Sequence, residues 1–167
     1  MVLGAAFFRR SAVTLAPLLV GKLLCRKTDG KTFCYRITET ECYFGEEDTA
    51  CHAHKGRTPR TDTLYAAGGI AYVYLCYGMH SLLNFVTGEE GHPEAVLIRG
   101  VEGISGPGRV TKAATLLLAA LSIIPCSAVM LEASPPRMTP TAVISGVTMV
   151  RSLPFTFTVP VSLFFRL

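Results

Sequence analysis

A glutamate, an arginine and a group of aromatic side chains are the residues of this chain whose types suit hydrolytic chemistry on a flat group. Glu41 lies in a polar stretch, and Arg99 ends a later apolar run. A carboxylate can polarise a water molecule, and an arginine beside it can hold that water in place. Tyrosines and His52 between them offer rings on which a flat, electron-poor group can stack. These residue types favour a water-activating site with a stacking pocket.

Each of these residues, taken by itself, also has an ordinary structural explanation. A single glutamate near a strand end is more often a solvated surface residue, and a tyrosine-rich strand usually packs in a core. A metal site is a second alternative, but the spacing of its possible ligands matches no recognised zinc pattern. We therefore expect no metal and no cofactor. The possible ligands are Cys42, Cys51, His52 and His54.

Alternating polar and apolar residues predict the strands that position the site. Residues 31–41 alternate after the turn-prone Asp29–Gly30 pair, which is typical of a half-buried strand in a hairpin and puts Glu41 near a strand end. Residues 11–20 predict an amphipathic helix before that hairpin. Residues 45–69 are rich in turn formers and charge, so we expect a long surface loop, with one helical turn around Asp48 to His52.

A second hairpin is expected after this loop. Residues 70–77 are dense in aromatic and β-branched side chains, and residues 81–86 return as a partner strand after a glycine turn. Tyr72 and Tyr74 share one strand face by the period of two, and we interpret Tyr72 as supporting structure. Residues 94–99 predict a further strand that ends in a basic residue.

An ordered set of sequence blocks resembles the alkyladenine (3-methyladenine) DNA glycosylase family over roughly residues 7 to 112. The resemblance implies an enzyme that flips a damaged purine out of duplex DNA and hydrolyses its N-glycosidic bond. Double-stranded DNA with alkylated or deaminated purines, of the 3-methyladenine or hypoxanthine type, is then the partner. The blocks are Arg36–Gly45, Asp48–His52, Gly56–Arg60, Ala71–His80, Asn84, Glu94–Arg99 and Gly106–Lys112.

The same resemblance implies the catalytic roles. Glu41 corresponds to the general base, and Arg99 and the backbone of His52 help to position the attacking water. No lysine occupies a matching position from which its amine could attack. The expected reaction is therefore water-driven and monofunctional, without strand cleavage.

The resemblance also assigns residues to base and DNA binding. Tyr43, His52 and Tyr74 match the rings that stack on the extruded base, and Asn84 matches a residue that crowds the exocyclic position distinguishing guanine from adenine. Tyr77, at the expected hairpin tip, matches the side chain that intercalates where the flipped base has left the stack.

Charge is compatible with a DNA partner and does not require one. The net charge is +4 and the isoelectric point is near 8.8, values that many unrelated proteins share. A glycine-proline-glycine turn before an expected helix would expose backbone N–H groups to an anion. The basic residues that could contact phosphates are Lys55, Arg57, Arg60, Arg109 and Lys112.

Beyond residue 112 the resemblance fades. Residues 113–167 form a divergent, apolar part in which four side chains are charged, and a segment of the family between Glu102 and Ser105 is missing. Two alternatives stay open for the whole chain. It could be an inactive remnant that binds lesions in DNA, or a membrane-associated protein that uses the uncharged run 113–131.

We expect one α+β domain spanning residues 1–167, with a curved, mostly antiparallel, barrel-like sheet, a protruding hairpin and peripheral helices. The six cysteines show neither a C-x-x-C pair nor the density of a secreted scaffold, which favours reduced thiols inside the cell. A monomer in the cytoplasm is expected, associated with the nucleoid in a bacterium or in the nucleus of a eukaryote.

Overall fold

The computed structural model describes residues 3–28, 31–115 and 130–131, which form an α+β fold around an antiparallel sheet. Six strands pair in the order β3-β4-β5-β2-β1-β7, and β6 pairs with β5 beside this path. The sheet is open in this part of the chain. The predicted α+β class is confirmed, but a closed barrel is not what the described strands form. The strands are β1 (Leu23–Thr28), β2 (Lys31–Phe44), β3 (Ile70–Cys76), β4 (His80–Val86), β5 (Glu94–Val101), β6 (Ile104–Ser105) and β7 (Met130–Leu131).

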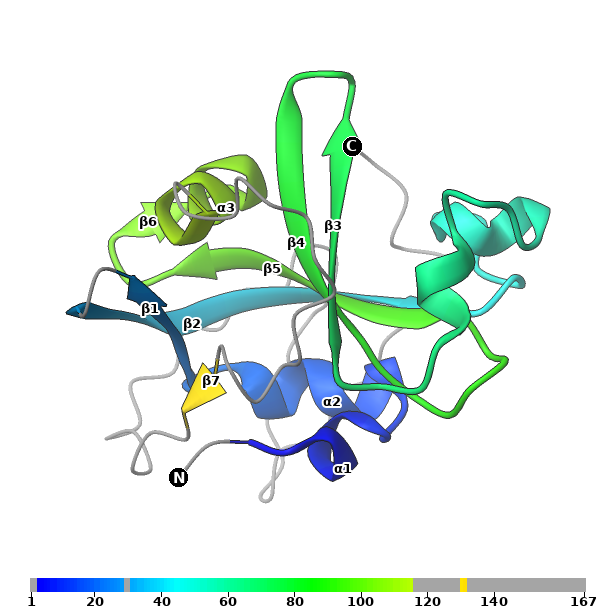
Figure 1. Cartoon of the computed structure of the whole chain (residues 1–167), viewed down its shortest axis with the longest axis horizontal. Coiled ribbons are helices and arrows are strands. Elements are labelled where there is room, and N and C mark those ends of the chain that lie inside the picture. Colours follow the sequence, from blue (N-terminus) through cyan, green and yellow to red (C-terminus); the bar gives the residue numbers. More distant parts are fainter. Residues whose placement is uncertain (1–2, 29–30, 116–129, 132–167) are drawn as a thin grey trace, which may run out of the picture.

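Two helices, α1 (Ala5–Phe8) and α2 (Ala12–Leu19), pack together on one face of the sheet (Figure 1). The helix predicted over residues 11–20 is thus confirmed. Its N-terminus is held by a buried carboxylate from a distant strand, because the backbone N–H of Ala12 donates to Oε2 of Glu94 at 2.6 Å. The helical macrodipole favours an anion at this end. A third helix, α3 (Pro107–Thr115), packs against β4 and β5.

Alternation along the strands gives the sheet two different apolar faces. Phe85, Val96 and Ile98 are fully buried in the cluster that includes α1 and α2. Their neighbours Ala95 and Leu97 point the other way, into a second cluster made with tyrosines and with the loop between β2 and β3. Since successive side chains of a strand point to opposite faces, the second cluster faces away from the helices.

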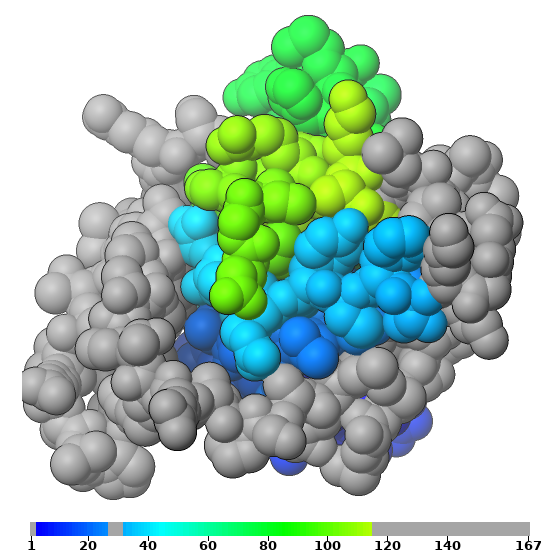
Figure 2. Space-filling model, turned by 90° about the vertical axis from the view of Figure 1, so that its left-hand side faces the viewer, coloured from blue at the N-terminus to red at the C-terminus, as the bar shows by residue number. Residues whose placement is uncertain are grey.

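The hairpin of β3 and β4 projects beyond the rest of the sheet (Figures 1 and 2). β4 pairs with β3 along its whole length but with β5 only through residues 84–86. Part of its free edge is covered by α3, where the hydroxyl of Thr111 accepts a hydrogen bond from the backbone N–H of Leu83 at 2.9 Å. Both strands of this hairpin, and the strand predicted over residues 94–99, are confirmed.

The loop after β2 differs from its prediction. Two 3-10 turns form, η1 (His52–Lys55) and η2 (Asp62–Tyr65), and neither begins at Asp48. The carboxylate of Asp48 accepts hydrogen bonds from the backbone N–H groups of Phe44 and Ala50, at 3.1 and 2.9 Å. An aspartate that bonds to neighbouring N–H groups in this way stabilises a turn instead of a helix. The predicted helical turn is therefore displaced to His52.

The expectation that all cysteines are thiols is wrong for one pair. Cys25 and Cys34 lie directly opposite each other in the β1–β2 hairpin and form a disulfide. Their Cα atoms are 4.1 Å apart. The pairing depends on the hairpin register, which a spacing of nine residues does not reveal. In the described part of the chain, Cys42, Cys51 and Cys76 are free.

None of the helices in the described residues is long and apolar enough to cross a membrane. The predicted apolar part 113–167 lies outside the described residues except for the end of α3 and the short strand β7. The same holds for most of the 113–131 run on which the membrane alternative depends.

Candidate active site

One row of paired residues runs across four strands on the face opposite α2. Tyr72 in β3 pairs with Asn84 in β4, Asn84 pairs with Leu97 in β5, and Leu97 pairs with Glu41 in β2. Directly paired residues of antiparallel strands point to the same face. The sheet register therefore brings Glu41 and Asn84 to a common surface, although 43 positions separate them in the sequence.

Glu41 is a buried carboxylate with two donors. Its side chain is 7% exposed, and its Oε2 accepts a hydrogen bond from Nη1 of Arg99 at 2.7 Å. Its Oε1 accepts one from the hydroxyl of Tyr43 at 3.2 Å. Burial, and then the charge of Glu41, raise the pKa of Tyr43, so the phenol stays protonated and continues to donate. The two donors fix the plane of the carboxylate and leave further lone pairs for a water molecule.

Arg99 keeps its positive charge beside Glu41. Burial alone would lower the pKa of Arg99, but the hydrogen bond with Glu41 and the charges of Glu41 and Glu39 outweigh burial, and the pKa lies above its usual value. Oε1 of Glu39 lies 3.4 Å from Nε of the same guanidinium. The cation is thus held between two carboxylates.

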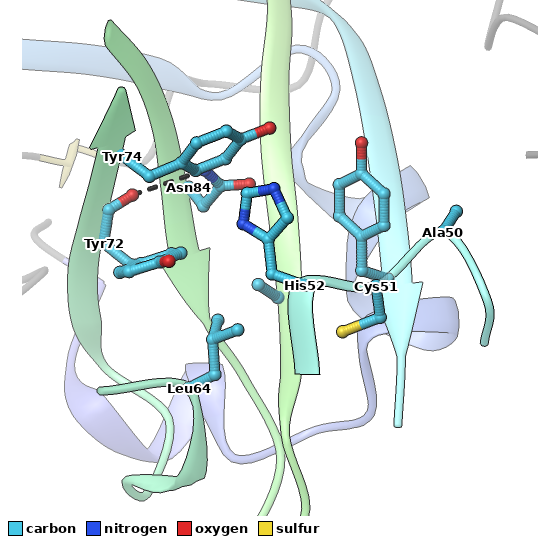
Figure 3. A pocket seen from close by; sticks show the side chains of 9 residues that line it. Ala50, Cys51, His52, Leu64, Tyr72, Tyr74 and Asn84 are labelled. Atoms are coloured by element: carbon cyan, nitrogen blue, oxygen red, sulfur yellow. Dashed lines mark hydrogen bonds between the residues drawn. The ribbon is translucent and has the colours of Figure 1, made fainter. Parts of the chain in front are cut away.

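A pocket opens on the same face, with Tyr72, Tyr74 and His52 around it (Figure 3), and Tyr43 also lines it. It contains about 250 Å³ of empty space, including its open mouth. Rings from β2, β3 and η1 make its walls, and β4 and β5 contribute a side chain each. Flat aromatic walls suit a flat ligand that binds by stacking. The lining residues are Tyr43, Ala50, Cys51, His52, Leu64, Tyr72, Tyr74, Asn84 and Ala95.

His52 lies beside Tyr74 at the pocket, with ring centroids 4.0 Å apart and ring planes at 75° (Figure 3). Burial, and then the charge of Arg60, lower the pKa of His52 below its ordinary value of 6.5. The imidazole is therefore neutral at pH 7. A centroid distance this short leaves no room for a third ring between His52 and Tyr74.

Asn84 is held rigidly at the inner end of the pocket. It is 1% exposed, and its amide nitrogen donates to the backbone carbonyls of Tyr72 and Leu82, at 3.3 and 3.2 Å. The first of these bonds is the dashed line in Figure 3. Because both partners are backbone atoms of paired strands, the side chain cannot swing away without breaking these bonds. It limits the size of a group placed against it.

The structure brings most of the predicted site residues together. Four of them, Tyr43, His52, Tyr74 and Asn84, line the pocket, and Glu41 with Arg99 joins it through the Tyr43 hydroxyl. The predicted intercalating residue does not belong to this group. Tyr77 stands at the hairpin tip, 76% exposed.

Sequence reasoning missed two contributors to this face. Tyr72, interpreted as supporting structure, lines the pocket, and its position two residues before Tyr74 was the signal that could have identified it. Glu39, beside Arg99, was not singled out. Its position two residues before Glu41 puts it on the same strand face in a regular strand.

The predicted phosphate contacts have different surroundings. Arg57 forms an ion pair with Asp62 at 2.6 Å and lies over the ring of Tyr65. Nη2 of Arg60 donates to the backbone carbonyl of Leu75 at 3.2 Å, which ties the loop to the hairpin. Of the remaining three, Lys55 is exposed in η1, and Arg109 and Lys112 are exposed on α3 beside the hairpin, where Figure 2 shows α3 and the hairpin adjoining on the surface.

The possible metal ligands of the loop are not brought together. Cys42 packs in the cluster on the α2 side, whereas Cys51 packs in the cluster on the pocket side. Nδ1 of His54 is hydrogen-bonded to the backbone carbonyl of Glu46 at 2.7 Å. In the part of the chain that the structure describes, no three His, Cys, Asp or Glu side chains are grouped so that they could hold a metal ion.

Comparison with known proteins places the chain among proteins named for one activity. A family profile described as methylpurine-DNA glycosylase matches residues 6–116. A protein of Borreliella afzelii named "Putative 3-methyladenine DNA glycosylase" is 48% identical over 118 residues, which are 64% of this chain and 63% of that protein. Proteins with the same name from Psychrobacter cryohalolentis and Myxococcus xanthus are 50% and 46% identical over 65% of this chain, and 54% and 60% of their own lengths are covered. The chain thus spans about three fifths of the length of these relatives.

Proposed function

The chain belongs to the methylpurine-DNA glycosylase family, and we propose that it removes alkylated or deaminated purines from duplex DNA by hydrolysing their N-glycosidic bonds. One observation carries the proposal: the buried carboxylate of Glu41, held by Tyr43 and Arg99, borders an aromatic pocket. A carboxylate in this setting can serve as a general base beside a stacking site.

The reaction follows from the groups at Glu41. A water molecule hydrogen-bonded to a free lone pair of the carboxylate attacks the sugar C1′ as the bond from C1′ to the base nitrogen breaks. The bonding electrons leave with the base, and Glu41 accepts a proton from the water. The guanidinium of Arg99 donates to Oε2 of the same carboxylate and holds it in place for this proton transfer. Cationic or electron-poor bases leave most readily, which sets the class of substrate.

Binding of the flipped base requires a small movement. The rings of His52 and Tyr74 are in contact, so the imidazole has to turn away before a base can stack against Tyr74. Tyr43 and Tyr72 provide the neighbouring ring faces. Asn84, fixed by two backbone hydrogen bonds, would collide with an additional exocyclic group, which disfavours normal guanine.

The hairpin supplies a group to fill the gap left in the DNA. Extruding a base costs a few kcal/mol of lost stacking, and an inserted side chain offsets part of this cost. Tyr77 is exposed at the tip, with Leu75 and Met79 also exposed beside it. An apolar tip of this kind suits insertion between bases.

The proposal is tested by single-turnover release of hypoxanthine from a duplex that carries one such lesion. We expect release by the parent protein and a loss of at least about 100-fold for Glu41→Gln, because the amide keeps the shape of the side chain but cannot accept the proton. Glu89→Gln removes a carboxylate from the exposed loop before β5 and serves as the control.

Two results would contradict the proposal. Equal release by the parent and by Glu41→Gln would remove Glu41 as the base. A folded parent that binds the lesion duplex selectively and releases no base would replace the enzyme with the alternative of a lesion-binding protein. The measurement therefore separates the enzyme from the alternative of a protein that binds lesions without excising them.

A further inference from the structure

We propose that Glu39 is a positioning residue that holds the guanidinium of Arg99 in the orientation in which it supports Glu41. The inference rests on the proposed function, because it assigns a further residue to the same site. Glu39 has no assigned role in that function. It lies two residues before Glu41 on β2, and its carboxylate meets a different nitrogen of the Arg99 guanidinium.

The geometry of Arg99 shows why one carboxylate is not enough. Its Nη1 donates to Oε2 of Glu41 at 2.7 Å. Its Nε is buried, and no acceptor among the described residues meets this atom with hydrogen-bond geometry. Oε1 of Glu39 lies 3.4 Å from Nε, within ion-pair distance. A buried cationic nitrogen without a counter-charge is costly, so Glu39 stabilises this placement of the guanidinium.

The backbone is adapted to place Glu39 there. The pairing of β2 with β5 shifts on both sides of Glu39, which lies opposite Gly100. A Cβ atom at Gly100 would come within 3.1 Å of the Cβ of Glu39 and 3.2 Å of its Oε2. Irregularities of this kind redirect side chains next to active sites. Glycine at position 100 and the register shift together make space for the Glu39 carboxylate beside Arg99.

The burial of the pair distinguishes it from an ordinary surface ion pair. The side chains of Arg99 and Glu39 are each 22% exposed. Another ion pair near the same two strands, between Arg36 and Glu102, has a distance of 3.8 Å and exposed fractions of 37% and 75%. Exposed pairs contribute little to stability or orientation, because water screens them. We therefore expect Glu39 to orient its partner and Glu102 to have no such effect.

By fixing the orientation of Arg99, Glu39 also affects how the attacking water is held. An arginine has five N–H donors in a fixed planar fork. With Nη1 bonded to Glu41 and Nε facing Glu39, the orientation of the fork is set from two sides, and the N–H groups on Nη2 are directed consistently. Without Glu39 the guanidinium can rotate while it keeps its bond to Glu41. Substrate binding should survive this change, but the chemical step should slow down.

The experiment compares Glu39→Ala, Glu39→Gln and the control Glu102→Ala in the full chain. For Glu39→Ala we expect single-turnover release of hypoxanthine to slow about 10-fold, the effect of losing one charge-assisted contact. The dissociation constant of the lesion duplex should stay within about twofold, as should that of the control. Glu39→Gln keeps the shape of the side chain but removes the counter-charge, so it should slow release about as much as Glu39→Ala does. A purely structural role would change binding and melting temperature together with the rate.

A second measurement does not depend on activity. In ¹H–¹⁵N spectra, the Nε–H of Arg99 should be protected from exchange in the parent and should exchange more rapidly in Glu39→Ala and in Glu39→Gln. Unchanged release and unchanged protection in Glu39→Ala would overturn the inference. A parent that releases no base would sink the proposed function, and the Arg99 signal would still decide whether Glu39 holds the guanidinium.

Discussion

Burial shifts the pKa values of the pocket's titratable rings further away from their charged forms. Burial is the main cause that raises the pKa of Tyr72 and of Tyr74, and burial followed by the charge of Arg60 lowers the pKa of His52. A neutral pocket can stack on a cationic base without repulsion, whereas a protonated His52 would repel it. The charge of this single ring should therefore influence which lesions are accepted.

The lowered pKa of His52 predicts a pH dependence with a definite sign. Because the pKa of His52 is lowered, the ring is neutral at pH 7 and becomes cationic only as the pH falls through that lowered value. Two like charges about 4 Å apart in water repel by about 1 kcal/mol. The ratio of release rates for a cationic alkylated purine over neutral hypoxanthine should therefore fall about fivefold upon acidification.

The measurement is single-turnover release of both lesions across the pH range below 7. His52→Phe is the matched control, because it keeps an aromatic ring that cannot be protonated. The ratio should not vary with pH in this variant. A parent ratio that does not change on acidification would contradict the role given to the charge of His52.

At the scale of elements, the β3–β4 hairpin is held by hydrogen bonds along its strands and has a strained backbone at its tip. The hydroxyl of Thr111 in α3 holds the β4 strand at Leu83. Closer to the tip, Arg60 donates a hydrogen bond to the backbone carbonyl of Leu75. At the tip Tyr77 has a φ of +49°, which is unfavourable for a residue with a side chain. Glycine would adopt this conformation more readily. The large side chain at this position therefore costs stability, which suggests that it is retained for function.

Tyr77→Gly should accordingly separate stability from function. We expect the free energy of unfolding to be unchanged or up to about 1 kcal/mol higher, because strain at the turn is relieved. Base release should slow about 10-fold or more, because the gap in the DNA stack is no longer filled. Urea unfolding and single-turnover release measure the two effects. Tyr77→Phe should retain both properties of the parent, and a Tyr77→Gly protein with parental release would show that the tip does not assist flipping.

For the whole molecule, the exposed basic side chains of the helical regions lie in two separate places. In Figure 1 the hairpin and α3 lie at the end of the molecule away from α1 and α2, although Val110 and Ala114 of α3 pack in the same core cluster as those two helices and the pocket lies on the opposite face of the sheet. Arg109 and Lys112 are exposed on α3, whereas Arg9 and Arg10 are exposed next to α1. A duplex that inserts its flipped base into the pocket would pass the first pair of cations and not the second.

This asymmetry should be visible in the salt dependence of DNA binding. Each phosphate contact contributes about 0.9 to the slope of log K against log salt. Replacing Arg109 and Lys112 by Gln should lower the slope for a lesion duplex by about 1.8. Fluorescence anisotropy at several salt concentrations measures it. The double variant of Arg9 and Arg10 removes the same charge from the α1 side and should leave the slope unchanged. Equal slopes for the two double variants would rule out a DNA face on α3.

Local sequence pattern was sufficient for the elements of the fold. Alternation predicted the strand that became β2, aromatic and β-branched content together with a glycine turn predicted the projecting hairpin, and local pattern also predicted β5 and the amphipathic helix α2. These signals are local, because a strand or helix must bury one of its own faces wherever it packs. The turn after Asp48 was misplaced because the sequence did not show that its carboxylate would bond to Phe44 and Ala50.

By itself, the sequence thus determined the types of the elements and, through its ordered motifs, the candidates Glu41, Tyr43, His52 and Asn84. Only the tertiary structure decided which of them meet. The row from Tyr72 to Glu41, the ion pair of Glu39 with Arg99 and the Cys25–Cys34 bond all depend on strand register. Register is set by the combined packing of partners that are distant in the chain. A shift of one residue would turn every side chain of a strand to the opposite face, and no local stretch of sequence contains that information.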